Sequence, residues 1–163
     1  MVRVTHLEIV SKEQWVRRAR GVSDIEIREC VVKQPRLNRF LYEYVGGDWH
    51  WVDRLVWPDE QWRQYAGSDN LKTFVAYRQG SIAGYYELQM QEGGSVEIRI
   101  FGITPEFIGQ GCGRLLLDNA IESAFAWGAQ RVWLHTCSRD HPNALSNYLK
   151  SGFTIFKVEE KPA

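Results

Sequence analysis

Apolar and polar residues alternate along several short runs of the chain, which is the pattern of half-buried strands. The clearest runs are residues 25–31, 73–77, 82–88 and 95–103. Gln79-Gly80 lies between the second and third runs and predicts a hairpin turn. These segments predict an antiparallel sheet in the first part of the chain.

Elsewhere the apolar residues recur at helical spacing. Helices are expected from Pro35 to Gly46-Gly47, from Pro58, from Leu115 to Gly128 and from Pro142 to Lys150, and residues 11–20 are predicted to form a polar helical extension. Further strands are expected at residues 4–10, 131–136 and 153–158. Because strands and helices alternate after an antiparallel start, the fold class is predicted to be α/β with a mixed sheet.

Length and charge narrow the class of protein. The chain has 163 residues, 44% of them hydrophobic and 25% charged, which favours a single globular domain over residues 1–163. Twenty basic and twenty acidic residues cancel, so the charge indicates neither a nucleic-acid nor a membrane partner. No apolar leader is evident, and Cys30, Cys112 and Cys137 are few, which favours reduced thiols in the cytoplasm.

The stretch most indicative of function runs from Pro105 to Arg114 and is followed by three leucines. Gly109, Gly111 and Gly113 alternate with other residues between a predicted strand and a predicted helix. Glycine allows a ligand to approach the backbone closely, and a helix start presents unpaired N–H groups and the positive end of its dipole. The loop therefore predicts an anion site, for a phosphate or a pyrophosphate.

The usual nucleotide-binding loops do not match this spacing. A Walker loop needs Gly-Lys-Ser/Thr, whereas Arg114 follows Gly113 here. The dinucleotide fingerprint needs its third glycine at another offset and an acidic residue about twenty positions later. A glycine-rich turn that merely caps a helix is the alternative at this point.

The order of the elements and two separated motifs resemble the GNAT acetyltransferase superfamily. Gly111-Cys112-Gly113-Arg114 matches the end of the family's acyl-CoA pyrophosphate loop, in which Ile108 replaces the usual Gln or Arg. Residues 144–153 match the family's Ala-x-x-x-Tyr-x-x-x-Gly-Phe. The resemblance covers about residues 25–158, leaves residues 1–24 as an N-terminal extension, and is closer to an uncharacterised bacterial subgroup.

The resemblance implies a central, mostly antiparallel sheet that splays at the cofactor site. It also implies direct transfer of an acetyl group from acetyl-CoA to a primary amine, with no metal. Gly102 is expected to tolerate a strand bulge at the splay, with an amide there as oxyanion donor. The resemblance assigns to acetyl-CoA the residues Phe101, Gly102, Ile103, Ile108, Gly109, Gln110, Gly111, Cys112, Gly113, Arg114, Asn143 and Tyr148.

Two residues are candidates for proton transfer, because the amine must lose a proton and the leaving thiolate benefits from one. Glu97 lies fourteen residues before Gly111, the offset of the base glutamate in the family's histone-acetylating branch, and would act through a water. Its alternative is an ordinary strand glutamate that faces solvent or pairs with a nearby arginine. Tyr148 is expected to protonate the CoA sulfur, and its alternative is a helix-packing residue.

The family builds its acceptor pocket largely from the first helices and the loop between them. That region holds Trp49 and Trp51, which are assigned to substrate binding, and also Trp57, Trp62 and several acids. Aromatic faces and carboxylates suit a cationic amine, either small or peptide-borne, and a second core under the loop is the alternative role for most of the tryptophans. Members of the family are often dimers, so a homodimer is allowed.

Three other hypotheses compete with this interpretation. His135, Cys137 and His141 have the residue types of a metal site, but a fourth ligand is not evident. Cys137 beside a histidine would suit the nucleophile of a thiol hydrolase, although direct transfer needs no covalent step. A non-catalytic acyl-CoA-binding or regulatory module would need neither Glu97 nor Tyr148.

Overall fold

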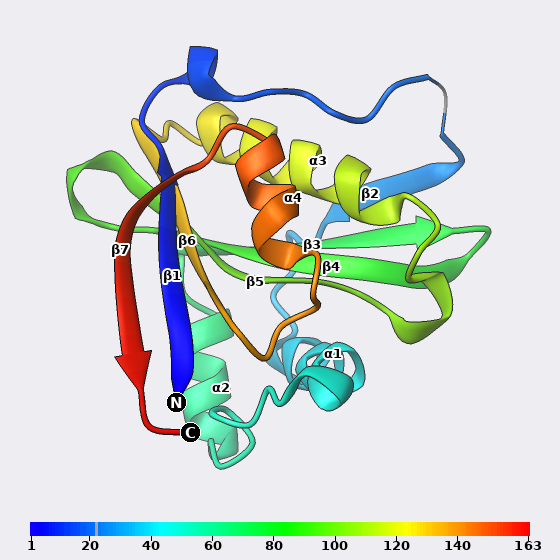
Figure 1. The fold of residues 1–163 in the computed structure, drawn as a ribbon. Coiled ribbons are helices and arrows are strands. Elements are labelled where there is room, and N and C mark those ends of the chain that lie inside the picture. Colours follow the sequence, from blue (N-terminus) through cyan, green and yellow to red (C-terminus); the bar gives the residue numbers. More distant parts are fainter. Residues whose placement is uncertain (22) are drawn as a thin grey trace.

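The structure is a computed structural model that describes residues 1–21 and 23–163. One seven-stranded sheet runs through it in the order β2-β3-β4-β5-β6-β1-β7. In Figure 1, α3 and α4 lie on one side of this sheet and α1 and α2 on the other. The strands are β1 (Val2–Ile9), β2 (Ile25–Glu29), β3 (Leu71–Arg78), β4 (Ser81–Met90), β5 (Ser95–Ile103), β6 (Arg131–Cys137) and β7 (Thr154–Lys161). The helices are α1 (Pro35–Gly46), α2 (Asp59–Ala66), α3 (Cys112–Ala126) and α4 (Ala144–Lys150).

The predicted mixed α/β sheet is confirmed. Strands β2 to β5 pair antiparallel in sequence order, and β5 pairs with β6 in parallel after the α3 crossover. The predicted hairpin joins β3 to β4, where Gln79 has a φ of 51° and Gly80 a φ of 84°. Two consecutive left-handed residues match the right-handed twist of a tight hairpin.

Strand β1 lies inside the sheet, between β6 and β7, and is antiparallel to both. Its side chains Leu7 and Ile9 are fully buried against the α3 face. The N-terminal extension, residues 1–24, therefore contributes an internal strand to the sheet through β1. Figure 1 shows both termini at the same end of the neighbouring strands β1 and β7.

The predicted helix over residues 11–20 is wrong, because that segment contains only a short 3-10 turn at Lys12–Gln14. Asp118 of α3 is buried, and its carboxylate accepts the backbone N–H groups of Arg18 and Ala19, at 3.1 and 2.7 Å, together with the indole N–H of Trp15. The Val16 N–H donates to the Ser151 carbonyl. A helix would need these N–H groups for its own hydrogen bonds, so the tertiary acceptors override the local preference.

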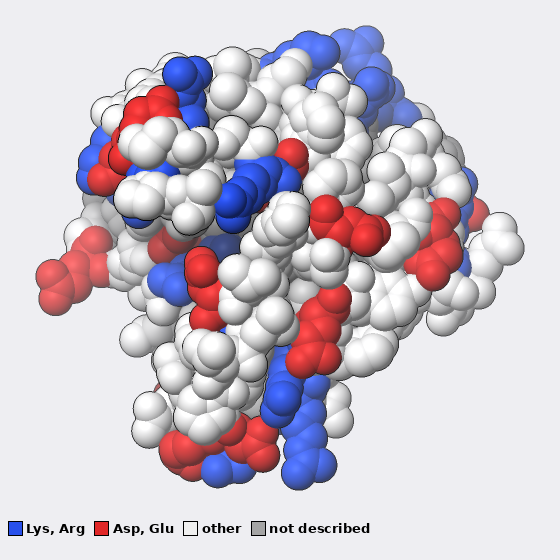
Figure 2. Space-filling model, turned by 60° about the horizontal axis from the view of Figure 1, so that its bottom comes forward, with Lys and Arg blue, Asp and Glu red and all other residues white. Residues whose placement is uncertain are grey.

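Two apolar cores lie on opposite faces of the sheet. The larger core packs α3 against β1, β4, β5 and β6, and the smaller core packs α1 against β3 and β4 around Leu41, Val45 and Tyr85. On the face drawn in Figure 2, basic and acidic side chains are interspersed, as the equal numbers of the two charges suggest. Among the helices of the described residues, none has the length and apolar character required to cross a membrane.

Replacing Asp118 with alanine is expected to lower the free energy of unfolding by about 2–3 kcal/mol, because two backbone N–H groups and an indole N–H lose a buried charged acceptor. Chemical denaturation followed by circular dichroism measures this change. Glu122→Ala, on the same helix but with an exposed side chain, is the control and should leave the midpoint unchanged. Equal midpoints for both variants would contradict the anchoring role of Asp118.

Candidate active site

Strands β5 and β6 separate after their first three residues. Their parallel pairing covers Ser95 to Glu97 on β5 and ends at the pair Glu97↔Trp133. Strand β6 continues to Cys137 paired with β1, and β5 continues to Ile103 paired with β4. We call the space between residues 99–103 of β5 and 134–137 of β6 the β5–β6 opening. The β5 edge that faces it has no strand partner among the described residues, so its backbone groups are available to a ligand.

A β-bulge lies where the strands part. Leu88 of β4 pairs with Ile98, but Glu87 pairs with Ile100, so Arg99 is the extra residue. A bulge bends its strand and increases the local twist, which turns β5 away from its neighbour. The prediction of a bulge at Gly102 is therefore wrong.

Gly102 has a packing role instead. A Cβ at Gly102 would lie 2.4 Å from Cγ1 of Val45 and 3.1 Å from Cη2 of Trp51. The missing side chain allows α1 and the Trp51 indole to pack against the backbone of β5. The end of β5 is thereby held from the α1 side, next to the β5–β6 opening.

The glycine loop joins β5 to α3, as predicted. Gly109 and Gly111 have φ values of 81° and 80°, and α3 begins at Cys112, directly after the left-handed Gly111. The side chain of Gln110 is used within the protein, because it donates to the Glu106 carbonyl and accepts from Arg78. Residues 108–111 are exposed, so the first amides of α3 open onto solvent as an anion site requires.

Tyr148 lies on α4, over the α3 face of the sheet. Its ring packs edge-on against Phe101 of β5 and Phe153, with centroids 6.3 and 6.0 Å apart. Burial, and then the negative charge of Asp140, raise the pKa of Tyr148 well above its usual value. The phenol is therefore protonated at neutral pH and able to donate.

Glu97 lies on the opposite face. It sits between Val96 and Ile98, which pack on the α3 core, so its side chain points away from α3. The carboxylate is almost fully buried, and its Oε1 accepts a hydrogen bond of 2.9 Å from Nε2 of Gln91. Arg99 and His135 approach within 3.6 and 3.9 Å. The ion pair with a nearby arginine that sequence reasoning left as an alternative is thus present.

Trp49 and Trp51 both lie near the opening, but in different ways. The indole of Trp49, in the 3-10 turn η2 (Gly47–Trp49), has its centroid 5.2 Å from the ring of His141, in the loop between β6 and α4. Trp51 packs on Gly46, on Gly102 and against Tyr42. The contact between Trp49 and His141 joins the α1–α2 segment to the loop that leads into α4. Asn143 ends this loop and is exposed.

Beside these residues lies a buried polar network that sequence reasoning missed. Glu87 of β4 is fully buried and accepts hydrogen bonds from Asn38, Arg54 and Tyr65. Burial opposes the charge of Arg54, but the facing Glu87 carboxylate raises the pKa of Arg54 above its usual value. The only signal in the sequence is a glutamate inside an otherwise apolar and aromatic strand.

Arg54 connects this network to aromatic residues of the α1–α2 segment. Its guanidinium lies 4.3 Å from the ring centroid of Tyr65 and 4.9 Å from that of Trp57. Trp57 and Trp62 also pack against each other, with centroids 4.9 Å apart. These two tryptophans thus pack against each other outside the two apolar cores, and Arg54 links them to the buried Glu87.

Cys137 ends β6 in a turn organised by Asp140. The Asp140 carboxylate accepts from the Cys137 backbone N–H at 2.9 Å and from the Thr136 hydroxyl at 2.5 Å. Burial raises the pKa of the Cys137 thiol, which disfavours the thiolate that a nucleophile needs. Within residues 1–21 and 23–163, no cluster of three or more His, Cys, Asp or Glu side chains is arranged to hold a metal ion.

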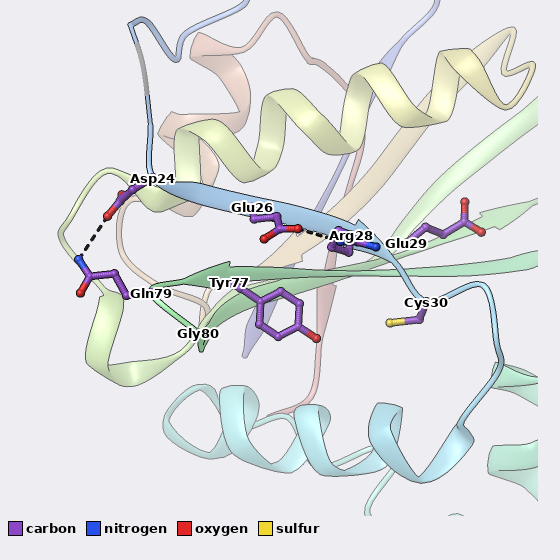
Figure 3. Close-up of a pocket in the computed structure, with 8 residues that line it drawn as sticks. All are labelled: Asp24, Glu26, Arg28, Glu29, Cys30, Tyr77, Gln79 and Gly80. Carbon is purple, nitrogen blue, oxygen red and sulfur yellow. Dashed lines mark hydrogen bonds and ion pairs between the residues drawn. The ribbon is translucent and has the colours of Figure 1, made fainter.

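Two surface hollows lie away from Glu97 and Tyr148. One, of about 610 Å³, is lined by residues of β2, by Cys30 directly after it and by the β3–β4 hairpin, where the Tyr77 ring lies on the α1 side in Figure 3. Strand β4 separates β3 from β5, so this hollow is set apart from the opening along the sheet. The other, of about 430 Å³, lies between α1 and the turn at Pro105–Phe107, and the Tyr44–Glu106 hydrogen bond spans the same two elements.

Glu87→Gln is expected to lower the free energy of unfolding by about 3 kcal/mol or more, because the buried Arg54 charge loses its partner. Thermal or urea unfolding measures the change. The exposed pair of Glu60 and Arg63 supplies the control, since Glu60→Gln should leave stability unchanged. A Glu87→Gln protein as stable as the control would show that the network does not anchor the α1–α2 loop.

Sequence comparison places these features in a known family. The profile of the Acetyltransferase (GNAT) family matches residues 38–153, which include the opening, the glycine loop and Tyr148. An uncharacterized N-acetyltransferase of Mycobacterium tuberculosis is 29% identical over 92 residues, a match that spans 56% of this chain and 58% of the relative. The chain thus matches little more than half the length of its curated relatives.

Solved structures share the fold at low sequence identity. A GCN5-related N-acetyltransferase from Sphaerobacter thermophilus gives a TM-score of 0.68 at 16% identity, over 96% of this chain and 49% of that one. An IAA acetyltransferase from Bacillus cereus gives 0.63 at 23% identity, over 82% and 79%. An aminoglycoside acetyltransferase from a soil metagenomic sample gives 0.64 at 16% identity, over 78% and 87%. With its fold, its glycine loop and the profile match over most of its length, the chain belongs to the Acetyltransferase (GNAT) family.

Proposed function

We propose that the protein is an N-acetyltransferase that moves an acetyl group from acetyl-CoA directly to a primary amine. The observation that carries the proposal is the arrangement around the β5–β6 opening. The phenol of Tyr148 lies on one face of the sheet and the carboxylate of Glu97 on the other, and the unpaired edge of β5 lies between them. A thioester bound along that edge would have a proton donor, Tyr148, on one face and a negatively charged carboxylate, Glu97, on the other.

The cofactor site follows from the same geometry. The free N–H and C=O groups of residues 99–103 would bind the pantetheine arm as an added strand, and an amide there would serve as oxyanion donor. The pyrophosphate would lie on the amides of residues 108–113, at the N-terminus of α3, with Arg114 adding a positive charge. Ile108 supplies no polar side chain, so the backbone would carry this contact.

The reaction requires a neutral amine, which attacks the thioester carbonyl as the C–S bond breaks. An ammonium acceptor first gives one proton to the Glu97 side, where the carboxylate supplies negative charge, and its nitrogen loses the second proton after the attack. Tyr148 gives its proton to the leaving thiolate and recovers one from the amine nitrogen through solvent. The raised pKa of Tyr148 keeps the phenol protonated until the thiolate forms.

The acceptor would enter from the α1–α2 side, beside Trp49 and Trp51. The indole of Trp49 is only partly buried, and Trp51 lines the base of the opening by packing on Gly102. Aromatic faces favour a cationic amine or an apolar group attached to it. We therefore propose a small or peptide-borne primary amine as the acceptor class.

Tyr148→Phe is expected to lower kcat about 10- to 100-fold, because the thiolate loses its proton donor. The dissociation constant for acetyl-CoA should change little, since the ring still packs against Phe101 and Phe153. Release of free thiol from acetyl-CoA in the presence of a panel of primary amines measures kcat.

Tyr44→Phe is the matched control, because Tyr44 is an exposed tyrosine whose hydroxyl binds Glu106 on the surface. It should keep the wild-type rate. Unchanged turnover by Tyr148→Phe at saturating substrates would remove Tyr148 from the mechanism. Acetyl-CoA binding without thiol release for any amine would favour the non-catalytic module.

A further inference from the structure

Glu97 and His135 stand side by side on the two strands that form the β5–β6 opening. His135 lies two residues beyond Trp133, the last residue of β6 paired with β5, and its side chain shares a face with Glu97. Nε2 of His135 is 3.9 Å from Oε2 of Glu97. The two side chains differ in access, because 51% of the His135 side chain is exposed and only 5% of the Glu97 side chain is. An acceptor entering from this face therefore meets the imidazole before the carboxylate.

We propose that His135 accepts the proton of the acceptor amine, and that Glu97 positions the imidazole and stabilises its charged form. The inference rests on the acetyltransferase function proposed above. In this proposal His135 takes the place of the water that was expected to carry the proton from the amine to Glu97. His135 is then a catalytic residue, and Glu97 acts through it as a positioning residue.

Glu97 is held in place for this role. Its Oε1 accepts from Nε2 of Gln91, and Oε1 of Gln91 in turn accepts from the indole N–H of Trp133. Oε2 is left facing His135. Because Nε2 of the imidazole lies toward the carboxylate, Nδ1 is the nitrogen left to accept a proton. At 3.9 Å the two atoms are beyond hydrogen-bond distance, and a closer approach would give the arrangement of a histidine base, in which a carboxylate orients one nitrogen while the other accepts a proton.

Titratable or charged side chains from three elements lie around His135. Strand β5 contributes Glu97 and Arg99, β1 contributes His6, and the turn after β6 contributes Asp140. Burial lowers the pKa of His135, and His6 and Arg99 add to this effect, while Glu97 and Asp140 oppose it. The imidazole is therefore neutral at pH 7, as a base must be before it accepts a proton.

The ring of His135 is also restrained by its neighbours. His6 lies 5.5 Å away between centroids, and Trp133 lies 6.5 Å away. His6 is itself fixed by a 2.9 Å contact between its Nε2 and Glu159. These contacts hold His135 against the opening and leave half of its side chain exposed, so the imidazolium can return its proton to solvent.

The proton transfer is balanced. An ammonium acceptor gives one N–H proton to Nδ1 of His135, which becomes an imidazolium, and the freed lone pair forms the new N–C bond as the C–S bond breaks. The second amine proton replaces the one that Tyr148 gives to the thiolate. The imidazolium then releases its proton to water, so the products are the amide, CoA thiol and one proton.

The test is chemical rescue of His135→Ala. We expect kcat to fall about 100-fold while the dissociation constant for acetyl-CoA, measured by calorimetry, stays within about twofold of wild type. Added imidazole should restore part of the rate in proportion to its neutral fraction. The wild type should lose activity as the pH falls below the usual pKa of histidine and the imidazole protonates, because burial lowers the pKa of His135, and the variant without imidazole should lack this acidic limb.

His50→Asn is the matched control, because His50 is an exposed histidine with a φ of 59°, a conformation that asparagine tolerates. It should keep both the wild-type rate and the acidic limb. A His135→Ala protein with the wild-type kcat, or one that binds acetyl-CoA normally but gains nothing from imidazole, would overturn the role of His135 alone. A wild type that releases no thiol with any amine would overturn the proposed function together with this inference.

Discussion

The hydrogen bonds between β5 and β6 end at the pair Glu97↔Trp133, and the rest of the candidate site depends on that separation. A parallel pair that continued would close the opening and satisfy the edge of β5. Here the extra residue Arg99 bends β5, and the absence of a side chain at Gly102 allows Val45 and Trp51 to hold its far end. Strand β1 fixes β6 from the other side along most of its length. The two strands are therefore held apart by packing, and an unpaired backbone edge is left for a ligand.

The bulge at this separation also places the proton donor and the proton acceptor on opposite faces of the sheet. Side chains alternate between the faces of a strand, and the extra residue at the bulge shifts that alternation, so Glu97 and Phe101 face opposite sides of the sheet. Phe101 receives Tyr148 from α4, whereas Glu97 faces His135 and Arg99. The phenol that donates a proton and the imidazole that accepts one are thus kept on opposite faces of the sheet, where they do not exchange a proton directly. The Glu87–Arg54 ion pair anchors the α1–α2 loop through Arg54, although it requires the burial of two charges.

Much of this arrangement could be predicted from local patterns. The alternation of residues 95–103, the Gln79-Gly80 turn and the glycine loop are set by nearest neighbours, and the structure contains each of them. The helix expected over residues 11–20 fails because Asp118, about a hundred residues away, captures its N–H groups. The bulge at Arg99 depends on the register with β4, and the pairing of His135 with Glu97 depends on where two strands stop. Such features are set by contacts between distant segments, and composition or spacing gives little sign of them.

The central claim is that acetyl-CoA binds with its pyrophosphate on the glycine loop and its thioester in the β5–β6 opening. Calorimetric titration with acetyl-CoA tests it most directly, with wild type compared with Gly111→Val and Gly93→Val. Both glycines have positive φ, and a Cβ added to either would meet no atom within 4 Å, so valine strains both backbones alike, but only Gly111 directly precedes α3. We expect saturable one-to-one binding by wild type and Gly93→Val, and at least about tenfold weaker binding by Gly111→Val. No binding by wild type up to millimolar acetyl-CoA, or equal affinities of the two variants, would contradict the account.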